Sequence, residues 1–442
     1  MSSEVITLLQ QLIRNECVND GTPQSGHEHR SVATLQEFFG VEGEIFEPAP
    51  GRQSLVYRVT GEDPDAPALA LVPHTDVVPV DRSGWSVDPF AAEVIDGFVY
   101  GRGAVDMLNV TAAMAAAARP YVTGDLTPKG DLIFIAAADE EAGGIHGAKV
   151  LADDHWDLVG AEYVLTEVAY PALEYADGPV VPVSIGEKGG VWSLLKSKGY
   201  PGHGSAPYRS DNALHKMVDA LKGIFDTPMP VGIIPEWADF VAALAVDPEV
   251  REALTDPDQV DRAIDDLAIT DPLFARYAHA LTHLTISPNM LDAGVKLNVI
   301  PDSATANLDI RSLPGMDRPF VESHLRKAMG QAGDDIDIEG VGYDLGPTVS
   351  PTGNPLWEAI GRGVEDMEGH RNLLPTLMTV GTDARFWRAK GSTGYGVGLF
   401  DDRMTFSEML ALFHGNDERV SVGSVEKTAA LYERVFHHFL SP

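Results

Sequence analysis

Ala68-Leu69-Ala70-Leu71-Val72-Pro73-His74-Thr75-Asp76 is a short apolar run that ends in polar, metal-capable side chains. Two further apolar runs share this design: residues 132–138 are followed by Asp139-Glu140-Glu141, and residues 163–166 are followed by Glu167. Runs of this length are typical of buried strands. Helical patterns separate them, and such alternation predicts an α/β fold with a mostly parallel central sheet and helices on both faces.

The residues that follow these runs are of the types that bind metal ions. Open α/β sheets build their sites at the carboxyl ends of the strands. His74, Glu141 and Glu167 stand there, and we interpret His414, within Leu412-Phe413-His414-Gly415, as standing at the end of another strand-like run. Imidazole nitrogen and carboxylate oxygen are common zinc ligands. The sequence therefore predicts a hydrolytic metal centre at this edge of the sheet.

Three neighbouring features support such a site, although the first two also have a simpler explanation. Asp76 could fix the second ring nitrogen of His74, but a histidine near an aspartate is often a surface accident. Asp106 follows two closely spaced glycines, which could equally form a plain turn. The adjacent acids of residues 139–141 would repel one another unless a cation is near. If one glutamate binds that cation, Glu140 stays free to move protons.

The candidate ligands together suffice for two ions. They are His74, Asp106, Glu141, Glu167 and His414. Two zinc-like ions fit this set if Asp106 bridges them. Ions about 3.5–4 Å apart activate a water molecule and polarise a carbonyl group, as in two-metal aminopeptidases.

Length, charge and cysteine content limit the class of protein. A chain of 442 residues is expected to form two domains or more. Its 66 acidic residues against 32 basic ones give a net charge of −34, which argues against nucleic acid or an anionic membrane as partner. Cys17 is the only cysteine, there is no signal-peptide pattern, and no apolar run approaches the roughly 20 residues of a membrane span. We therefore expect a cytoplasmic protein.

The sequence pattern changes after Gly189-Gly190. Residues 190–345 show strand and helix patterns in an order that predicts an inserted α+β lid domain, with a helical insert at about 232–285. The catalytic domain is then expected in two parts, at 1–189 and 346–442. Strand patterns at 191–198 and 336–343 could form an open edge of the lid sheet, and open edges favour pairing with another chain.

Seven short blocks, in this order along nearly the whole chain, resemble a known family. They are His74-Thr75-Asp76-Val77-Val78-Pro79, Tyr100-Gly101-Arg102-Gly103-Ala104-Val105-Asp106-Met107, Asp139-Glu140-Glu141, His203-Gly204-Ser205, Asn298-Val299-Ile300-Pro301, Gly381-Thr382-Asp383-Ala384, and His414-Gly415 with Glu418. The family is that of co-catalytic zinc hydrolases, which includes aminoacylase, acetylornithine deacetylase, succinyl-diaminopimelate desuccinylase, carnosinase-type dipeptidases and yeast carboxypeptidase S.

The resemblance implies the roles of the metal ligands. One zinc ion would be held by His74 and Glu167, the other by Glu141 and His414, with Asp106 as the bridge. Cobalt and manganese would also suit this mixed set of histidine and carboxylate ligands. Relatives often have a cis bond after the bridging carboxylate, which makes Asp106-Met107 a candidate cis peptide.

The resemblance also implies the catalytic residues. Asp76 would orient His74, and Glu140 would be the general base. His203, on the lid, would reach the active site of a partner chain and stabilise the oxyanion.

Substrate binding is implied at four further positions. Asn298 and Arg311 would grip the carboxylate of the substrate, and Gly381 and Thr382 belong to a block that is assigned to substrate binding. The expected partner is therefore a small peptide or an N-acyl amino acid.

The expected function is hydrolysis of an amide or peptide bond next to a free carboxylate, by a dipeptidase, a carboxypeptidase or an N-acyl-amino-acid deacylase. One alternative is a catalytically silent member that binds or regulates. The other is a two-metal phosphoesterase, against which the chain shows no Gly-rich phosphate cradle. A homodimer through the lid is expected, unless the insert at 232–285 covers the open edge and leaves a monomer.

Overall fold

A computed structural model describes residues 2–167, 169–173, 178–342 and 346–441. In that part of the chain the larger of the sheets has nine strands. In spatial order they are β1 (Glu44–Phe46), β2 (Ser54–Val59), β6 (Leu132–Ala136), β3 (Leu69–Leu71), β7 (Tyr163–Thr166), β18 (Thr393–Gly396), β8 (Val181–Glu187) and β16 (Thr348–Val349), with β17 (Leu373–Met378) pairing in parallel with β8. The pairs in the middle are parallel, and antiparallel pairs stand toward the two ends. The predicted α/β fold with a mostly parallel central sheet is confirmed.

Helices cover both faces of this sheet. Successive side chains along a strand point to opposite faces, and in β6 the side chains on both faces are apolar. Leu132 and Phe134 of β6 join the core on one face, whereas Ile133 and Ile135 join the core on the other. The first face packs against α1 (Ser2–Arg14), α2 (His29–Phe39), α3 (Leu108–Val122), α12 (Pro355–Glu368) and α15 (Val422–Leu440). The second face packs against α4 (Ala148–Asp154), α5 (Trp156–Val159) and α13 (Ala384–Arg388). The loops at the carboxyl ends of the strands stay free of this cover.

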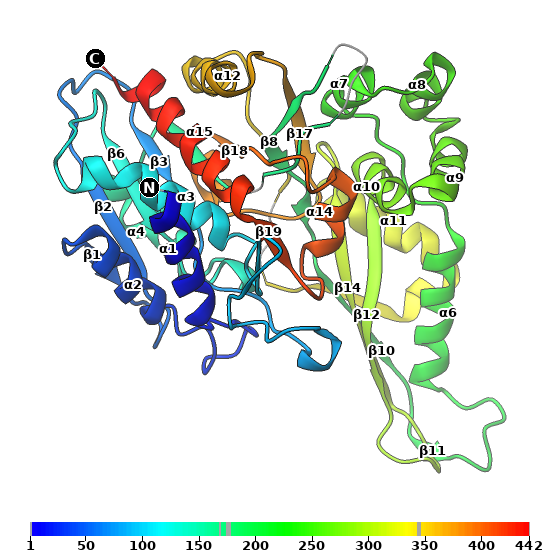
Figure 1. Ribbon diagram of the computed structural model, residues 1–442. Coiled ribbons are helices and arrows are strands. Elements are labelled where there is room, and N and C mark those ends of the chain that lie inside the picture. The colour runs from blue at the N-terminus through cyan, green and yellow to red at the C-terminus, as the bar shows by residue number, and fades with distance from the viewer. Residues whose placement is uncertain (1, 168, 174–177, 343–345, 442) are drawn as a thin grey trace.

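The lid is a separate antiparallel sheet with helices on one side (Figure 1). Its strands, in spatial order, are β12 (Thr285–Ala293), β14 (Ser303–Ser312), β10 (Ser193–Lys198) and β15 (Ile336–Gly340), and β9 (Gly189–Gly190) pairs with β14. Its long helices are α6 (Ala213–Asp226) and α11 (Arg318–Met329). At the far tip, β11 (Gly202–His203) pairs with β13 (Val299–Ile300).

Four short helices form the insert expected at about 232–285. They are α7 (Pro235–Ala243), α8 (Pro248–Thr255), α9 (Val260–Thr270) and α10 (Pro272–Thr282). Helix α7 packs on β17 of the large sheet, and α10 packs on α14 (Phe406–Leu412). The insert therefore joins the lid to the catalytic part of the chain.

A small sheet connects two segments that are distant in sequence. It consists of β4 (Val94–Ile95), β5 (Phe98–Tyr100) and β19 (Arg419–Ser421). Because β5 and β19 pair, the loop after β5 lies beside the loop before β19. No helix in the described residues is long and apolar enough to cross a membrane.

Two expectations about strands are wrong. His414 does not follow a strand: it comes two residues after helix α14, whose apolar residues gave the impression of a strand-like run. The segment 191–198 does not form an open edge either, because β10 lies between β14 and β15. The outer strands of the lid sheet are β12 and β15.

Candidate metal centre

His74 stands just beyond the carboxyl end of β3 with one ring nitrogen turned toward the site. The Thr111 hydroxyl donates to its backbone carbonyl at 2.9 Å, and the ring is completely buried. Its Nδ1 lies 3.0 Å from the backbone carbonyl oxygen of Asp76 and 3.5 Å from the Asp76 carboxylate. An Nδ1–H that donates to this carbonyl leaves a lone pair on Nε2. Asp76 is therefore placed beside His74 as expected, but its backbone oxygen is the nearer partner.

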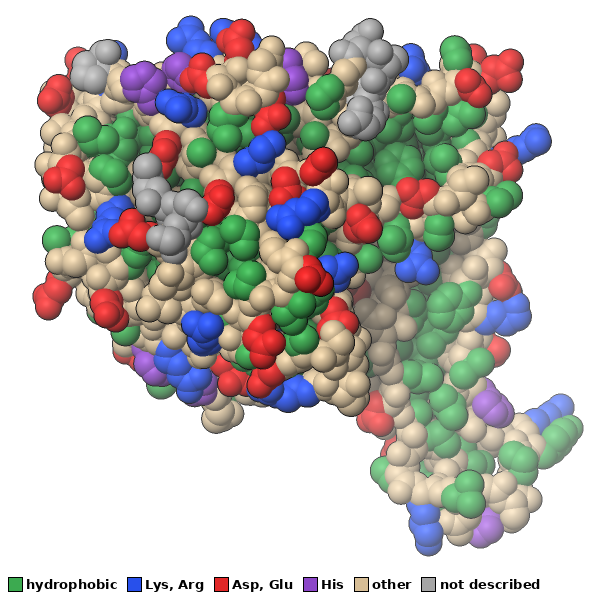
Figure 2. All heavy atoms as spheres, viewed as in Figure 1, with side chains coloured by type: hydrophobic (Ala, Val, Ile, Leu, Met, Phe, Trp, Pro, Cys, Tyr) green, Lys and Arg blue, Asp and Glu red, His purple; other side chains and the backbone are tan. Residues whose placement is uncertain are grey.

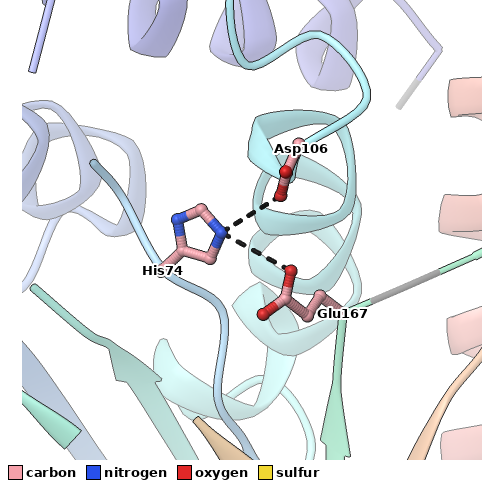
Figure 3. Close-up of side chains that lie close together, drawn as sticks. All are labelled: His74, Asp106 and Glu167. Atoms are coloured by element: carbon pink, nitrogen blue, oxygen red, sulfur yellow. Dashed lines mark ion pairs between the residues drawn. The ribbon is translucent and has the colours of Figure 1, made fainter. Parts of the chain in front are cut away.

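Two carboxylates approach this free nitrogen. His74 Nε2 lies 3.4 Å from Asp106 Oδ1 and 3.6 Å from Glu167 Oε2 (Figure 3). The three side chains come from the ends of β3 and β7 and from the turn before α3. They form one group that could hold a metal ion.

A second group uses the other oxygen of the same aspartate. His414 Nε2 lies 3.2 Å from Asp106 Oδ2 and 3.3 Å from Glu141 Oε2. Asp106 is thus shared between the two groups. The peptide bond between Asp106 and Met107 is cis, as predicted.

The spacing of these atoms suits metal coordination. Two ligand atoms bound about 2.0–2.1 Å from one tetrahedral zinc ion lie roughly 3.3–3.4 Å apart. The four distances from a histidine nitrogen to a carboxylate oxygen fall between 3.2 and 3.6 Å. Each group therefore fits around a single ion.

The chemistry of the donors also fits. Among the described residues, His74 Nε2 and Glu141 Oε1 are buried and have no hydrogen-bond partner, which is a costly arrangement for a polar atom in a protein without a cation nearby. Burial, reinforced by the charge of Asp106, raises the pKa of Glu141 to about 8. Hydrogen bonds to Asp106 and Glu141 raise the pKa of His414 to about 10. Crowded carboxylates of this kind are stabilised by a cation.

A buried carboxylate holds the loop that carries Asp106. Glu418 accepts hydrogen bonds from the backbone N–H groups of Gly103 at 3.1 Å, Val105 at 2.7 Å and Asp106 at 3.2 Å. The Arg102 guanidinium donates to the same carboxylate at 2.7 Å. Sequence reasoning did not give Glu418 a role, although it stands in the same block as His414.

A similar arrangement holds the acidic turn after β6. The backbone N–H groups of Glu140 and Glu141 donate to the two oxygens of the Asp76 carboxylate, at 3.2 and 3.1 Å. The side chain of Glu140 lines the adjacent pocket. Burial raises the pKa of Glu140 to about 6.

A pocket of about 240 Å³ opens beside Glu140, Glu141 and His414. Its other walls come from the lid and from the catalytic part: Gly190, Trp192, Arg311, Val341 and Gly342, and Ala142, Gly143, Ile145, Val380, Gly381 and Arg385. Four large apolar side chains thus stand beside the candidate metal ligands. Sequence reasoning missed Trp192 and Arg385. Both lie outside the recognised blocks.

Arg311 is oriented within this pocket. Its Nε donates to Asp309 at 2.7 Å and its Nη2 at 3.3 Å, and its guanidinium lies 5.3 Å from the centre of the Trp192 ring. The Trp192 indole N–H donates to the same carboxylate at 2.9 Å. This arrangement holds a planar cation close to the metal ligands.

Thr382 lies outside the pocket, whereas Gly381 lines it. The backbone N–H and the hydroxyl of Thr382 both donate to Glu187, at 2.9 and 2.7 Å. Glu187 also pairs with Arg388 at 2.9 Å. The threonine therefore braces the end of β8, where the chain enters the lid.

His203 and Asn298 are far from this pocket, at the tip of the lid (Figure 1). The backbone N–H of Gly204 donates to the Asn298 carbonyl, and the Ser205 hydroxyl lies 2.7 Å from His203 Nδ1. Arg311 stands near the opposite end of β14, roughly 30 Å from this tip at about 3.3 Å per residue. One chain therefore does not bring Asn298 and Arg311 together.

Comparisons with known proteins agree on one family. The model described as Peptidase family M20/M25/M40 matches residues 70–438. Human aminoacylase-1 is 28% identical over 445 residues, which cover 97% of this chain and 94% of that protein. A succinyl-diaminopimelate desuccinylase from Rhodospirillum centenum is 26% identical over 452 residues, which cover 100% of this chain and 98% of that protein.

Solved structures show the same fold. An M20 family metallo-carboxypeptidase from Sulfolobus solfataricus superposes with a TM-score of 0.74 at 17% identity, covering 99% of both chains. The Bacillus subtilis protein YXEP, described as a dinuclear metal binding peptidase of the M20 family, superposes with a TM-score of 0.55 at 14% identity, covering 98% of both chains.

Proposed function

The chain belongs to peptidase family M20/M25/M40, and the relatives named above support hydrolysis of peptide or N-acyl amino acid bonds. We propose how the residues of this chain perform that reaction. The observation that carries the proposal is the pair of histidine and carboxylate groups that share Asp106, with Glu140 beside them. The proposed substrate is a small peptide or an N-acyl amino acid with a free carboxylate next to the scissile amide.

Two divalent metal ions would occupy the site. His74 and Glu167 would hold one, Glu141 and His414 would hold the other, and Asp106 would bridge them. Bound there, the ions would supply Lewis acidity to the attacking water and to the amide carbonyl. We propose zinc as the native metal, since imidazole and carboxylate donors suit it, with cobalt and manganese as working substitutes.

Glu140 would move the protons. Its carboxylate lines the pocket beside the ligands, and its pKa of about 6 lets it accept a proton from water near neutral pH. The same carboxyl group would then pass the proton to the leaving amine. Asp76 supports this step, because it holds the backbone of Glu140 and lies against His74.

Arg311 would bind the carboxylate of the substrate. Its guanidinium lies in the pocket and is held by Asp309, and guanidinium groups bind carboxylates through paired hydrogen bonds. The apolar side chains of Trp192 and Val341 beside it would contact the rest of the substrate.

His203 and Asn298 would act across a dimer, because both lie at the tip of the lid. We propose a two-fold dimer in which each tip reaches the pocket of the other chain. Several large apolar side chains of the lid are exposed, and such a patch favours an interface (Figure 2). They include Tyr200, Tyr208, Met290, Leu291, Val295 and Leu297.

A substrate panel tests the function. Purified protein loaded with Zn²⁺, Co²⁺ or Mn²⁺ is offered dipeptides and N-acetyl amino acids, each as the free acid and as the C-terminal amide, and also a set of phosphate esters. We expect metal-dependent release of the free amine from the acids and little from the amides. Turnover of phosphate esters alone would instead favour a two-metal phosphoesterase, and no turnover of any substrate would favour a silent member.

A further inference from the structure

All three backbone N–H groups of Asp139-Glu140-Glu141 are held by buried carboxylates. The N–H of Asp139 donates to Glu28 Oε1 at 3.2 Å, and the next two donate to Asp76. Glu28 and Asp76 are completely buried. The orientation of this turn, and with it the direction of the side chains of Glu140 and Glu141, therefore depends on two carboxylates that do not face the pocket.

Asn19 and Arg52 hold these carboxylates in turn. Asn19 Nδ2 donates to Asp76 at 2.8 Å and to Asp139 at 3.3 Å. Arg52 donates through Nη2 to Asn19 Oδ1 at 2.8 Å and through Nη1 to Glu28 at 2.9 Å, and its Nε lies 3.6 Å from Asp139. Both side chains are buried. Asn19 thus connects the carboxylate that supports Glu140 with the first residue of the turn.

The network is assembled from parts of the chain that are distant in sequence. Asn19 follows α1, Glu28 immediately precedes α2, Arg52 precedes β2, and Asp139 follows β6. A planar guanidinium can bind several acceptors at once in fixed directions, which a lysine ammonium cannot do in the same way. Arg52 also offsets the negative charge of Glu28 and Asp139, and all three side chains are buried.

We propose that Arg52 and Asn19 are positioning residues, which set the backbone of residues 139–141 so that Glu140 moves protons and Glu141 binds metal. The inference rests on the proposed function for the roles of those two glutamates. Neither Arg52 nor Asn19 lines the substrate pocket. Their loss should therefore lower metal affinity and kcat while leaving KM nearly unchanged.

The test compares Arg52→Met and Asn19→Ala with Arg58→Met as the matched control. Arg58, on β2, also forms an ion pair, with Asp131 at 2.6 Å, although this pair is more exposed than that of Arg52, and its guanidinium donates to the Leu158 carbonyl at 2.8 Å. In the described part of the chain, no hydrogen bond of Arg58 involves residues 139–141. Thermal unfolding records the stability of each variant, so that loss of stability and loss of positioning are separated.

Metal binding is measured by titrating metal-free protein with Co²⁺, followed by calorimetry and by visible absorption, which reports the coordination geometry. Changes to residues that orient metal ligands typically cost about 10–100-fold in affinity or activity. We expect a loss of that size in Co²⁺ affinity and in kcat for Arg52→Met and Asn19→Ala, with KM within about twofold and an altered cobalt spectrum. Arg58→Met should be less stable than the unmodified protein but should keep its Co²⁺ affinity, its cobalt spectrum and its kcat.

Unchanged Co²⁺ affinity, spectrum and kcat in folded Arg52→Met would overturn the inference. Equal losses in Arg58→Met would also overturn it, since general destabilisation would then be sufficient. If Arg52→Met does not fold, Asn19→Ala decides by the same measurements, because it removes an uncharged side chain. The Co²⁺ titration does not depend on turnover, so absence of hydrolysis in the unmodified protein would count against the proposed function and leave this test intact.

Discussion

Glu140 and Glu141 are neighbours in sequence, and the structure gives them different surroundings. Glu141 faces His414 across 3.3 Å, and its pKa of about 8 reflects burial beside Asp106. Glu140 lines the pocket as Glu141 does, but it belongs to neither candidate metal group, and burial raises its pKa only to about 6. A proton acceptor works best when its pKa lies near the operating pH. The two side chains therefore suit different tasks, one at the metal and one at the substrate.

Glu140→Gln tests whether Glu140 and Glu141 have different tasks, because it replaces one carboxylate oxygen with an amide nitrogen. The amide keeps the size of the side chain but cannot accept the proton, so turnover should fall by roughly 10²–10⁴-fold. Metal content, measured by plasma emission spectrometry, should stay at the unmodified value. Glu141→Gln is the contrasting variant, which should lose metal as well as activity. Near-normal turnover in Glu140→Gln would place the base at another residue.

Arg311→Lys tests the carboxylate site. Lysine keeps the charge but cannot form the paired hydrogen bonds of a guanidinium, so KM for free-acid substrates should rise roughly tenfold, equivalent to about 1.4 kcal/mol. Arg326→Lys is the control, because Arg326 is also a lid arginine but donates to the carbonyls of Gly333 and Ile336. Steady-state kinetics on both variants make the comparison. An equal KM for Arg311→Lys and the unmodified protein would remove Arg311 from substrate binding.

At the scale of the elements, two of the loops that carry candidate ligands are each held by a buried carboxylate that accepts backbone N–H groups. Glu418 holds the loop that ends at Asp106, and Asp76 holds the turn that contains Glu140. A turn that ends a strand leaves its N–H groups without ladder partners, and a buried N–H without an acceptor is costly. The carboxylates satisfy these groups and fix the direction of the ligands at the same time.

Glu418→Gln tests the importance of that support. The amide still fits, but the buried guanidinium of Arg102 loses its ionic partner, and breaking a buried pair costs about 3–5 kcal/mol. Denaturant unfolding should show a decrease of this size in the free energy of unfolding, and Co²⁺ affinity should fall. Glu408→Gln is the control: Glu408 also accepts a backbone N–H, from Thr405, but at the exposed start of α14, where glutamine can accept the same bond and the loss should be small. Equal stability of the two variants would contradict the account.

Local pattern was sufficient to predict β3, β6 and β7, because short apolar runs followed by polar residues report buried strands directly. It also led to the five candidate ligands that the structure groups around Asp106. His414 was placed after a strand only because helix α14 is apolar, and periodicity over seven residues does not separate the two.

Features that depend on the tertiary structure could not be predicted from the sequence. Asn19 and Arg52 stand in loops whose sequence gives no sign that they will be buried beside the acidic turn. Thr382 was assigned to substrate binding by its block, but its hydroxyl is bonded to Glu187. In each case the partner comes from a distant segment, so a single sequence offers no local signal.

At the scale of the whole molecule, the proposed site residues lie in two places that one chain keeps apart. The candidate ligands Glu141 and His414 line one pocket with Arg311. Strand β11, which contains His203, lies at the far tip of the lid (Figure 1). The outer strand β12 leaves part of its backbone open to pairing, and the helical insert packs instead on β17 and α14. This arrangement supports the proposed dimer over the monomer. Light scattering should then give twice the chain mass of 47.5 kDa.

Mixing two inactive variants tests whether His203 acts in the other chain. His203→Ala keeps Glu140 but lacks the lid histidine, and Glu140→Gln keeps the histidine but lacks the base. In a two-fold dimer with exchanged lids, a hybrid has one pocket with both groups intact, so random mixing should restore about a quarter of the unmodified activity. Mixing each variant with itself is the control and should restore nothing. If His203 served its own chain, every pocket of the hybrid would lack one group, and the mixture would stay inactive even though light scattering still showed a dimer.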